Sequence, residues 1–168
     1  MIFDPEFPIE LHTDASADGY GAILFQKFYN DLRVVSKRTT NAESKYHSYE
    51  LETLAVVNAV KHFRHYLQGH KFTVITDCNS VKASRNKIDL TPRVHRWWTF
   101  LQAFEFDILY REGKRMNHVD FLSRNPLPKT TSCTVGKIER VMSTLKGMLS
   151  TKILNSSKTD WINKCYKH

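Results

Sequence analysis

The spacing of hydrophobic and polar positions divides residues 9–124 into short strands and longer helices. Alternating or short apolar runs predict strands at residues 9–13, 22–27, 32–36, 71–76 and 107–110. Helical spacing predicts helices between Thr40 and Gly69 and at residues 80–85, 93–104 and 119–124. We interpret Asp18-Gly19-Tyr20-Gly21 as the turn between the first two strands, and Thr40-Asn41-Ala42-Glu43 as a capping box that starts the long helix.

This order of elements predicts an α/β domain with a mixed five-stranded sheet. The first three strands follow one another through short connections, as antiparallel strands do. The long helix before the fourth strand is long enough for a crossover to a parallel neighbour. We therefore expect three antiparallel strands, then parallel strands, with helices packed on the faces of the sheet.

The long helix carries one carboxylate on its apolar side. At about 100° per residue, Glu52 lies within about 40° of Val56, Ala59 and Phe63, whereas Glu50 lies with the polar residues on the other side. A charge that faces the core is costly unless it meets a cation, a hydrogen-bond donor or a metal ion. A salt bridge to Arg or Lys and a metal site are both open interpretations at this point.

A change of composition after residue 126 separates a domain from a tail. Residues 1–126 hold the predicted elements, and residues 127–168 form a basic, Ser/Thr/Lys-rich tail that we expect to be a linker or disordered. The chain has a formal net charge of +8, but residues 1–124 hold 17 Lys and Arg against 15 Asp and Glu. Because most of the excess lies in the tail, net charge is weak evidence for nucleic-acid binding.

Cysteine spacing and hydropathy exclude several classes of protein. Cys78, Cys133 and Cys165 are odd in number and far apart, which argues against a disulfide framework or a zinc site. There is no basic, apolar leader and no apolar run of about 20 residues. We expect an intracellular protein, in the cytoplasm, the nucleus or a virus-like particle, with no membrane partner.

Four carboxylates lie at the ends of predicted elements. Asp14 and Asp77 follow strands, Glu52 lies early in the crossover helix, and Asp120 begins the last helix. Parallel strands place their carboxyl ends at one edge of a sheet, where ligand sites form. Hard oxygen ligands without Cys or His favour Mg²⁺ or Mn²⁺. Each acid taken alone also fits a capping or turn role, so spacing alone leaves both interpretations open.

Four blocks of sequence, in this order, resemble the ribonuclease H domain of reverse transcriptases from gypsy-type LTR retrotransposons. They are LHTDAS at residues 11–16, ELETLAVV at 50–57, TVITD at 73–77 and NHVDFLSR at 117–124. The resemblance covers about residues 2–126. It implies a ribonuclease H-like fold and cleavage of the RNA strand of RNA–DNA hybrids, with two Mg²⁺ ions, for which Mn²⁺ can substitute, and no small-molecule cofactor.

By this resemblance, Asp14, Glu52, Asp77 and Asp120 match the metal-binding catalytic acids. We expect Asp14 to bridge both ions, Glu52 and Asp77 to hold the ion near the leaving oxygen, and Asp120 to hold the ion that positions the attacking water. His118 has two interpretations, either a general acid or product-release group, or an ordinary exposed residue at a helix start. The second is the more common situation.

Candidate contacts with the hybrid lie beside the acids and in the basic segment after Asp77. Lys and Arg contacts with phosphates give affinity without sequence preference, and hydroxyl and amide groups can reach the 2′-hydroxyl. The candidates are Ser16, Asn79, Lys82, Arg85, Arg93 and Arg96. A solvated basic helix, with Trp97 or Trp98 facing the core, is the alternative.

Two departures from the family favour a second hypothesis. The segment at residues 28–36 is shorter than in the family, which suggests a reduced third strand, and a polymerase Tyr-x-Asp-Asp block is missing. The chain is therefore expected to be a fragment of a Pol polyprotein that cannot synthesise DNA alone. It could be a catalytically silent remnant or hybrid-binding module, or a part that needs its polymerase domain in cis or in trans.

Overall fold

The computed structural model describes residues 7–26, 31–85, 90–126, 143–145 and 147–148. The chain divides into two compact units, Met1–Lys129 and Thr130–His168. In the second unit, residues 143–145 and 147–148 are helical. The remainder of the predicted tail lies outside the described residues. Among the helices that the structure describes, none combines the length and the apolar character needed to cross a bilayer.

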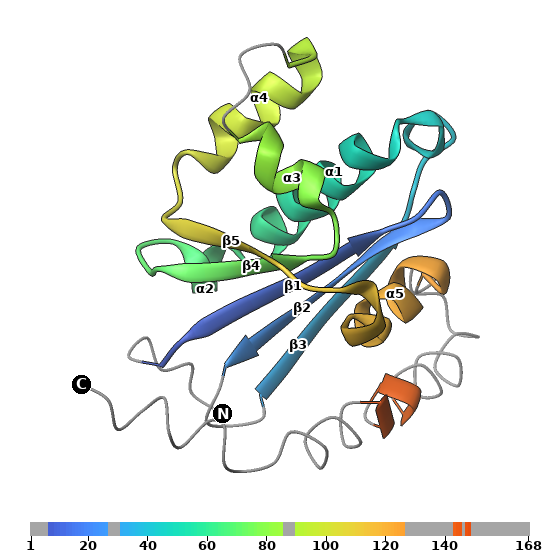
Figure 1. Ribbon diagram of the computed structural model, residues 1–168. Coiled ribbons are helices and arrows are strands. Elements are labelled where there is room, and N and C mark those ends of the chain that lie inside the picture. The colour runs from blue at the N-terminus through green and yellow to red at the C-terminus, as the bar shows by residue number, and fades with distance from the viewer. Residues whose placement is uncertain (1–6, 27–30, 86–89, 127–142, 146, 149–168) are drawn as a thin grey trace. The chain divides into compact units, whose positions relative to one another are not determined.

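The first unit is built on a mixed five-stranded sheet (Figure 1). Its strands are β1 (Ile9–Ala15), β2 (Gly19–Gln26), β3 (Asp31–Arg38), β4 (Phe72–Thr76) and β5 (Phe106–Tyr110). Their order across the sheet is β3-β2-β1-β4-β5. The pairs β1·β2 and β2·β3 are antiparallel, and the pairs β1·β4 and β4·β5 are parallel. The predicted fold class is confirmed.

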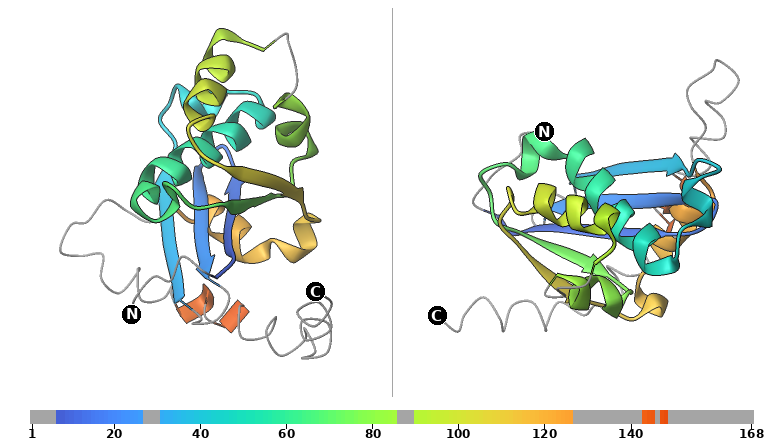
Figure 2. Two further views of the ribbon diagram at one scale, coloured as in Figure 1. Left: turned by 90° about the vertical axis from the view of Figure 1, so that its left-hand side faces the viewer. Right: turned by 90° about the horizontal axis from the view of Figure 1, so that it is seen from above.

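Helices cover both faces of this sheet (Figures 1 and 2). They are α1 (Ser48–His62), α2 (Arg64–Leu67), α3 (Asn79–Ser84), α4 (Pro92–Leu101) and α5 (Asn117–Arg124), with 3₁₀ turns η1 (Glu43–Lys45) and η2 (Gly113–Arg115). Helix α1 packs on β1 and β2, and α3 and α4 pack against α1. Helix α5 lies on the opposite face, against β1, β2 and β3.

The hydrophobic core lies between the sheet and α1. Leu11, Val74, Val56, Val60 and Phe63 are among its buried members. Because the sheet lies on one side of α1 and α3 and α4 lie on another, an unbroken run from Glu50 to Val57 is buried. Helix α1 is therefore a central helix rather than the one-sided helix that its sequence suggests.

The predicted start of the long helix is wrong. The capping box does form, because the Thr40 N–H donates to Glu43 Oε2 at 2.8 Å and the Glu43 N–H donates to Thr40 Oγ1 at 3.2 Å. It caps the short η1 turn, however, and α1 begins later, at Ser48. Helix α1 ends at His62, and Gly69 has a φ of +82°, a conformation that favours glycine, after the short α2.

The expected reduction of the third strand is also wrong. Strand β3 is eight residues long, and its partners run along the whole of β2, from Gly19 opposite Arg38 to Gln26 opposite Asp31. The third strand is therefore paired along the full length of its neighbour. The sheet that supports α1 and α5 is complete in this respect.

The two glycines of the expected first turn lie inside β2, and their role is packing. The turn itself is Ser16–Asp18, closed by the Ser16 N–H donating to the Gly19 carbonyl at 2.8 Å. A Cβ on Gly21 would lie 2.5 Å from Leu122 Cβ and 3.0 Å from the Val119 carbonyl oxygen. Glycine at this position thus allows α5 to lie directly on the sheet.

Candidate active site

Three carboxylates meet at the edge of the sheet where β1 and β4 end. One oxygen each from Asp14, Glu52 and Asp77 lies within 4.8 Å of the others. Asp14 is 5% exposed, Glu52 is 8% exposed and Asp77 is half-buried. The constellation expected from the sequence is therefore present for these three acids.

Strand register explains why Asp14 and Asp77 meet. The parallel pairing places His12 beside Ile75, so two residues further along each chain Asp14 and Asp77 reach the same level. The loop after β5 also approaches closely, since a Cβ on Gly113 would lie 3.0 Å from Asp77 Oδ2. Glu52 joins them from the first turns of α1, whose packing on β1 directs it to this edge.

Glu52 has no cation partner among the described residues. Its Oε1 accepts a hydrogen bond from the Ala15 N–H at 3.3 Å, and its Oε2 is buried without a hydrogen-bond partner in the part of the chain that the structure describes. Burial, together with the neighbouring charges of Asp14 and Asp77, raises the pKa of Glu52 from 4.5 to about 9. The salt-bridge interpretation of Glu52 is not supported.

The other two acids carry the same electrostatic cost. The pKa of Asp14 is raised from 3.8 to about 6. Burial is the largest cause, the hydrogen bond from the Ser123 hydroxyl partly offsets it, and the charges of Asp77 and Asp120 add to the rise. The pKa of Asp77 is also raised, chiefly by burial. Crowded, desolvated carboxylates of this kind are stabilised in the ionised form by a cation among them.

The donor set fits a hard divalent cation. All three groups are carboxylates, with no sulfur or imidazole within the cluster. The buried Glu52 Oε2 is a free ligand atom in the described structure, pointing to a missing positive partner. Divalent metal binding is therefore the chemistry that this edge of the sheet can perform.

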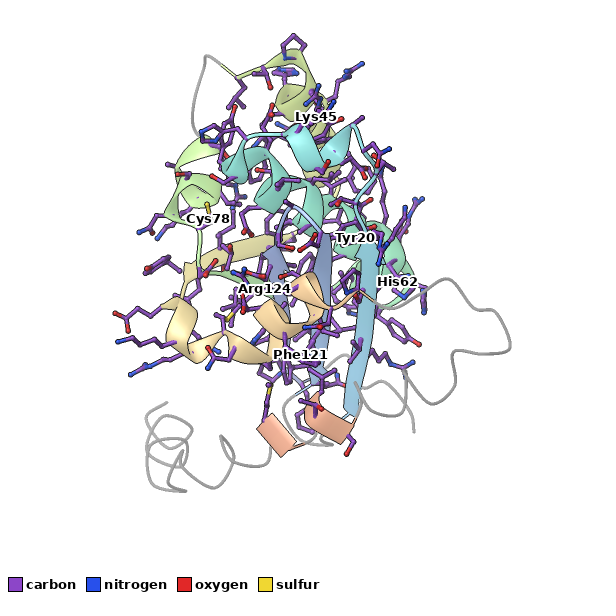
Figure 3. All side chains as sticks on the ribbon, turned by 90° about the vertical axis from the view of Figure 1, so that its right-hand side faces the viewer. Tyr20, Lys45, His62, Cys78, Phe121 and Arg124 are labelled. Carbon is purple, nitrogen blue, oxygen red and sulfur yellow. The ribbon has the colours of Figure 1, made fainter. Side chains whose placement is uncertain are left out.

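Asp120 lies next to the cluster but outside it. Its Oδ1 accepts from Arg124 Nε at 2.7 Å, one turn further along α5, and its side chain is 41% exposed (Figure 3 labels Arg124). The charge of Asp120 nevertheless raises the pKa of both Asp14 and Asp77. An exposed i,i+4 ion pair stabilises a helix by only about 0.3–0.5 kcal/mol. Breaking the pair with Arg124 would therefore cost little if Asp120 turned to bind a metal ion.

Glu50 is buried as well, for a different reason. It lies across α1 from Glu52, as its spacing predicts, but that side of the helix is covered by α4 rather than by solvent. Glu50 Oε1 accepts from the Thr91 hydroxyl at 3.1 Å, and Oε2 lies 3.6 Å from Arg93 NH1. Glu50 thus makes the salt bridge that could have been assigned to Glu52.

His118 is buried, so its interpretation as an exposed residue at a helix start is wrong. It is 2% exposed, and its Nε2 lies 2.9 Å from Nδ1 of the buried His12. His12 Nε2 lies 3.0 Å from Glu10 Oε2. His12 precedes Asp14 by two residues, so the two side chains lie on the same face of β1. This spacing is the sequence signal that could have predicted that His12 also faces α5, where it contacts His118.

Among the proposed hybrid contacts, the hydroxyl of Ser16 is engaged within the protein. It donates to the Ser123 carbonyl at 2.9 Å and accepts from the Asp18 and Gly19 N–H groups at 3.2 and 3.3 Å. Asn79 is exposed at the start of α3, directly after Cys78 (labelled in Figure 3). Contacts of both residues with a nucleic acid stay predictions.

The basic candidates differ in how freely they are exposed. Arg85 NH1 donates to the Phe106 carbonyl at 3.1 Å, and the Arg93 guanidinium lies 3.8 Å from the Tyr46 ring centroid as well as beside Glu50. Lys82 on α3 and Arg96 on α4 are exposed. Trp98, in contrast, is buried and donates to Ser84 Oγ at 3.2 Å, as the core interpretation expects.

The raised pKa values predict that the metal-free domain loses stability as pH rises. The folded chain binds more protons than the unfolded chain wherever the pH lies between the unfolded and folded pKa values of these acids. This range runs from pH 3.8 to about 6 for Asp14 and from pH 4.5 to about 9 for Glu52. Its free energy of unfolding therefore falls with increasing pH in this range. We expect the loss between about pH 6 and pH 8.5 in EDTA to be at least about 1 kcal/mol, measured by urea unfolding.

The double variant Asp14→Asn, Glu52→Gln is the control, because it keeps every other titratable group. The difference between its stability curve and that of the wild type isolates the two carboxylates. A difference that does not change with pH would contradict the expectation. Added Mg²⁺ should reduce the wild-type loss at the higher pH, because it binds the ionised carboxylates.

Sequence comparison identifies relatives over most of the chain. The family model described as "RNase H-like domain found in reverse transcriptase" matches residues 4–104. The transposon Tf2-3 polyprotein of Schizosaccharomyces pombe is 31% identical over 172 residues, a match that covers 93% of this chain and 13% of the polyprotein. The Tf2-4 polyprotein matches equally well. The chain thus spans about an eighth of the length of these curated relatives.

Solved structures share the fold at low sequence identity. A foamy viral protease-reverse transcriptase in complex with an RNA/DNA hybrid has a TM-score of 0.54 and 18% identity, covering 64% of this chain and 16% of that one. LC11-RNase H1 in complex with an RNA/DNA hybrid has a TM-score of 0.58 and 12% identity, covering 70% and 95%. At these identities the likeness establishes the architecture of the sheet and helices.

Proposed function

The chain belongs to the family of RNase H-like domains found in reverse transcriptases, and from this membership we propose that it is a metal-dependent endoribonuclease that cleaves the RNA strand of RNA–DNA hybrids. The observation that carries the proposal is the buried carboxylate of Glu52, which lies beside Asp14 and Asp77 with no cation among the described residues. An enzyme of this family generally uses divalent metal ions. We propose Mg²⁺ as the natural ion and Mn²⁺ as a substitute.

Asp14, Glu52 and Asp77 would hold the metal, with Asp120 completing the set from α5. Bound divalent ions supply activation of a water and stabilisation of the leaving oxygen in phosphodiester hydrolysis. The protein holds the carboxylates in place before the substrate arrives, since β1, β4 and α1 fix their backbone positions. Burial excludes water from Asp14 and Glu52, which strengthens their interaction with a cation.

The relatives favour an RNA–DNA hybrid as the substrate, because two of the structures that share the fold are complexes with such a hybrid. We propose that the chain acts as part of a retrotransposon Pol polyprotein, with a polymerase domain in cis or in trans, in the cytoplasm, the nucleus or a virus-like particle. The silent-remnant hypothesis loses one of its supports, since β3 is complete and three acids converge.

The test uses the full 168-residue chain and an RNA–DNA hybrid with end-labelled RNA. We expect endonucleolytic cleavage of the RNA strand that requires Mg²⁺, and no cleavage of double-stranded DNA. A sample that circular dichroism shows to be folded, but that fails to cut the hybrid in Mg²⁺ or Mn²⁺ with or without the cognate polymerase domain, would refute the enzyme proposal. Cleavage only in the presence of that domain would identify a requirement for the polymerase in trans.

The exposed basic side chains Lys82 and Arg96 are expected to contact phosphates of the hybrid. We expect Lys82→Glu and Arg96→Glu each to weaken hybrid binding and to reduce the slope of log K against log salt concentration by about 1, because each removes a phosphate contact. Lys71→Glu is the matched charge reversal, since Lys71 precedes β4 and pairs with Asp107 at 3.2 Å, at the end of the strand away from Asp77. Equal salt slopes for all three variants would contradict the proposal that Lys82 on α3 and Arg96 on α4 contact phosphates of the hybrid.

A further inference from the structure

The hydroxyl of Ser123 joins α5 to one of the site carboxylates. Ser123 is fully buried, and its Oγ donates a hydrogen bond to Asp14 Oδ2. The same oxygen lies 2.9 Å from the Asp120 carbonyl oxygen, a second acceptor. A hydroxyl carries a single hydrogen, and the charged acceptor makes the stronger bond, so an ionised Asp14 holds it.

Ser123 itself is fixed from three sides. Ser16 donates to the Ser123 carbonyl at 2.9 Å, and Ser36 on β3 donates to the neighbouring Leu122 carbonyl at 3.1 Å. The absence of a side chain at Gly21 allows the backbone of α5 at Ser123 to approach β2. These contacts fix the backbone of α5 against the sheet, and the fixed backbone in turn sets the position of the Ser123 hydroxyl.

We propose that Ser123 is a positioning residue for the metal site, which fixes the orientation of the Asp14 carboxylate and ties it to the helix that carries Asp120. The inference rests on the proposed function. Groups that hydrogen-bond to metal ligands set the orientation of those ligands, and losing them typically reduces metal affinity or activity about 10–100-fold. Because Ser123 follows Asp120 by three residues on one helix, this hydrogen bond joins the Asp14 carboxylate to the helix that carries Asp120.

A purely structural hydrogen bond would behave differently. Losing any buried hydroxyl on or against α5 would lower the stability of the domain, whichever carbonyl or carboxylate it contacts. Only a hydroxyl that orients Asp14 would also change the affinity of the site for a metal ion. Ser36 provides the comparison, since its hydroxyl contacts the same helix through a backbone carbonyl and, in the contacts described, touches none of the site carboxylates.

The experiment measures Mn²⁺ binding to the metal-free full chain by calorimetry or electron paramagnetic resonance, alongside the Mg²⁺ dependence of hybrid cleavage. We expect Ser123→Ala to weaken Mn²⁺ binding about 10-fold or more and to shift the Mg²⁺ requirement in parallel. Ser123→Cys, which keeps a weak donor of similar size, should fall between Ala and the wild type. Ser36→Ala should lose stability but bind Mn²⁺ as the wild type does.

Wild-type Mn²⁺ affinity in folded Ser123→Ala or Ser123→Cys would overturn the inference and leave the proposed function standing. Failure of the wild type to bind Mn²⁺ at all would instead overturn the proposed function, and the inference with it. If Ser123→Ala does not fold, Ser123→Cys, which keeps only a weak donor, carries the same test. An equal loss of affinity in Ser36→Ala would also overturn the inference, since it would assign the effect to α5 packing.

Discussion

Replacing Glu52 by Gln is expected to reduce hybrid cleavage at least about 100-fold, whereas replacing Glu50 by Gln should leave most of it intact. The two substitutions make the same chemical change two residues apart on one helix. Glu52 belongs to the three-carboxylate cluster, so Gln removes a charge from the proposed metal site. The measurement is the Mg²⁺-dependent cleavage rate of the full chain on a labelled hybrid.

Glu50 provides a demanding control because it is nearly as buried as Glu52, at 9% against 8% exposed. Gln at position 50 can still accept from the Thr91 hydroxyl, and only the 3.6 Å ion pair with the partly exposed Arg93 is lost. Such pairs contribute about 1 kcal/mol or less. Equal inactivation by both substitutions would contradict the assignment of the site to one side of α1.

The same Glu52 variant should be more stable than the wild type in EDTA, and the gain should grow with pH. Since the pKa of Glu52 is raised to about 9, the folded wild type must keep a proton that the unfolded chain releases above pH 4.5. Gln has no proton to keep. Loss of activity together with gain of stability separates a functional carboxylate from a structural one.

The second large effect is expected from Gly21→Ala, which adds one methyl group where α5 meets β2. The new Cβ would lie 2.5 Å from Leu122 Cβ and 3.1 Å from the Ser123 nitrogen, so the helix must move away from the sheet. Overpacking of this kind costs about 1–3 kcal/mol. We expect a fall in the free energy of unfolding and a larger proportional fall in cleavage, because Asp120 and Ser123 move with the helix.

Gly69→Ala is the matched control for a loss of stability without displacement of the site. Gly69 has a φ of +82°, and no atom lies within 4 Å of a Cβ added there. The left-handed conformation costs a non-glycine residue about 1–2 kcal/mol. If both glycine variants lose stability to a similar degree but keep the same cleavage rate, α5 placement does not control the site.

Much of the fold was accessible from the sequence because strand alternation and helix spacing are local signals. The length of the crossover predicts the parallel placement of Asp14 beside Asp77, and the angular position of Glu52 on the helix predicts that it faces them. The structure confirms that these three groups converge. Each of these inferences needed only the sequence of one or two elements.

The failures concern contacts between elements that the sequence does not specify locally. Thr40–Glu43 has the spacing of a capping box, but nothing in that spacing says which of two successive helical segments it caps. Gly21 resembles a turn glycine until α5 is placed on β2. Glu50 and His118 carry polar groups that favour solvent, and their burial is explained only by α4 and His12.

The order of the site residues along the chain has a consequence for folding during translation. Asp14 is among the first residues of the domain to be made, whereas its hydrogen-bond donor Ser123 is among the last. The second edge of β1 can be paired only after β4 has been synthesised. During translation, Asp14 can reach this donor only after about residue 124 has left the ribosome, so a chain interrupted before α5 lacks both the Ser123 contact and the Asp120 carboxylate.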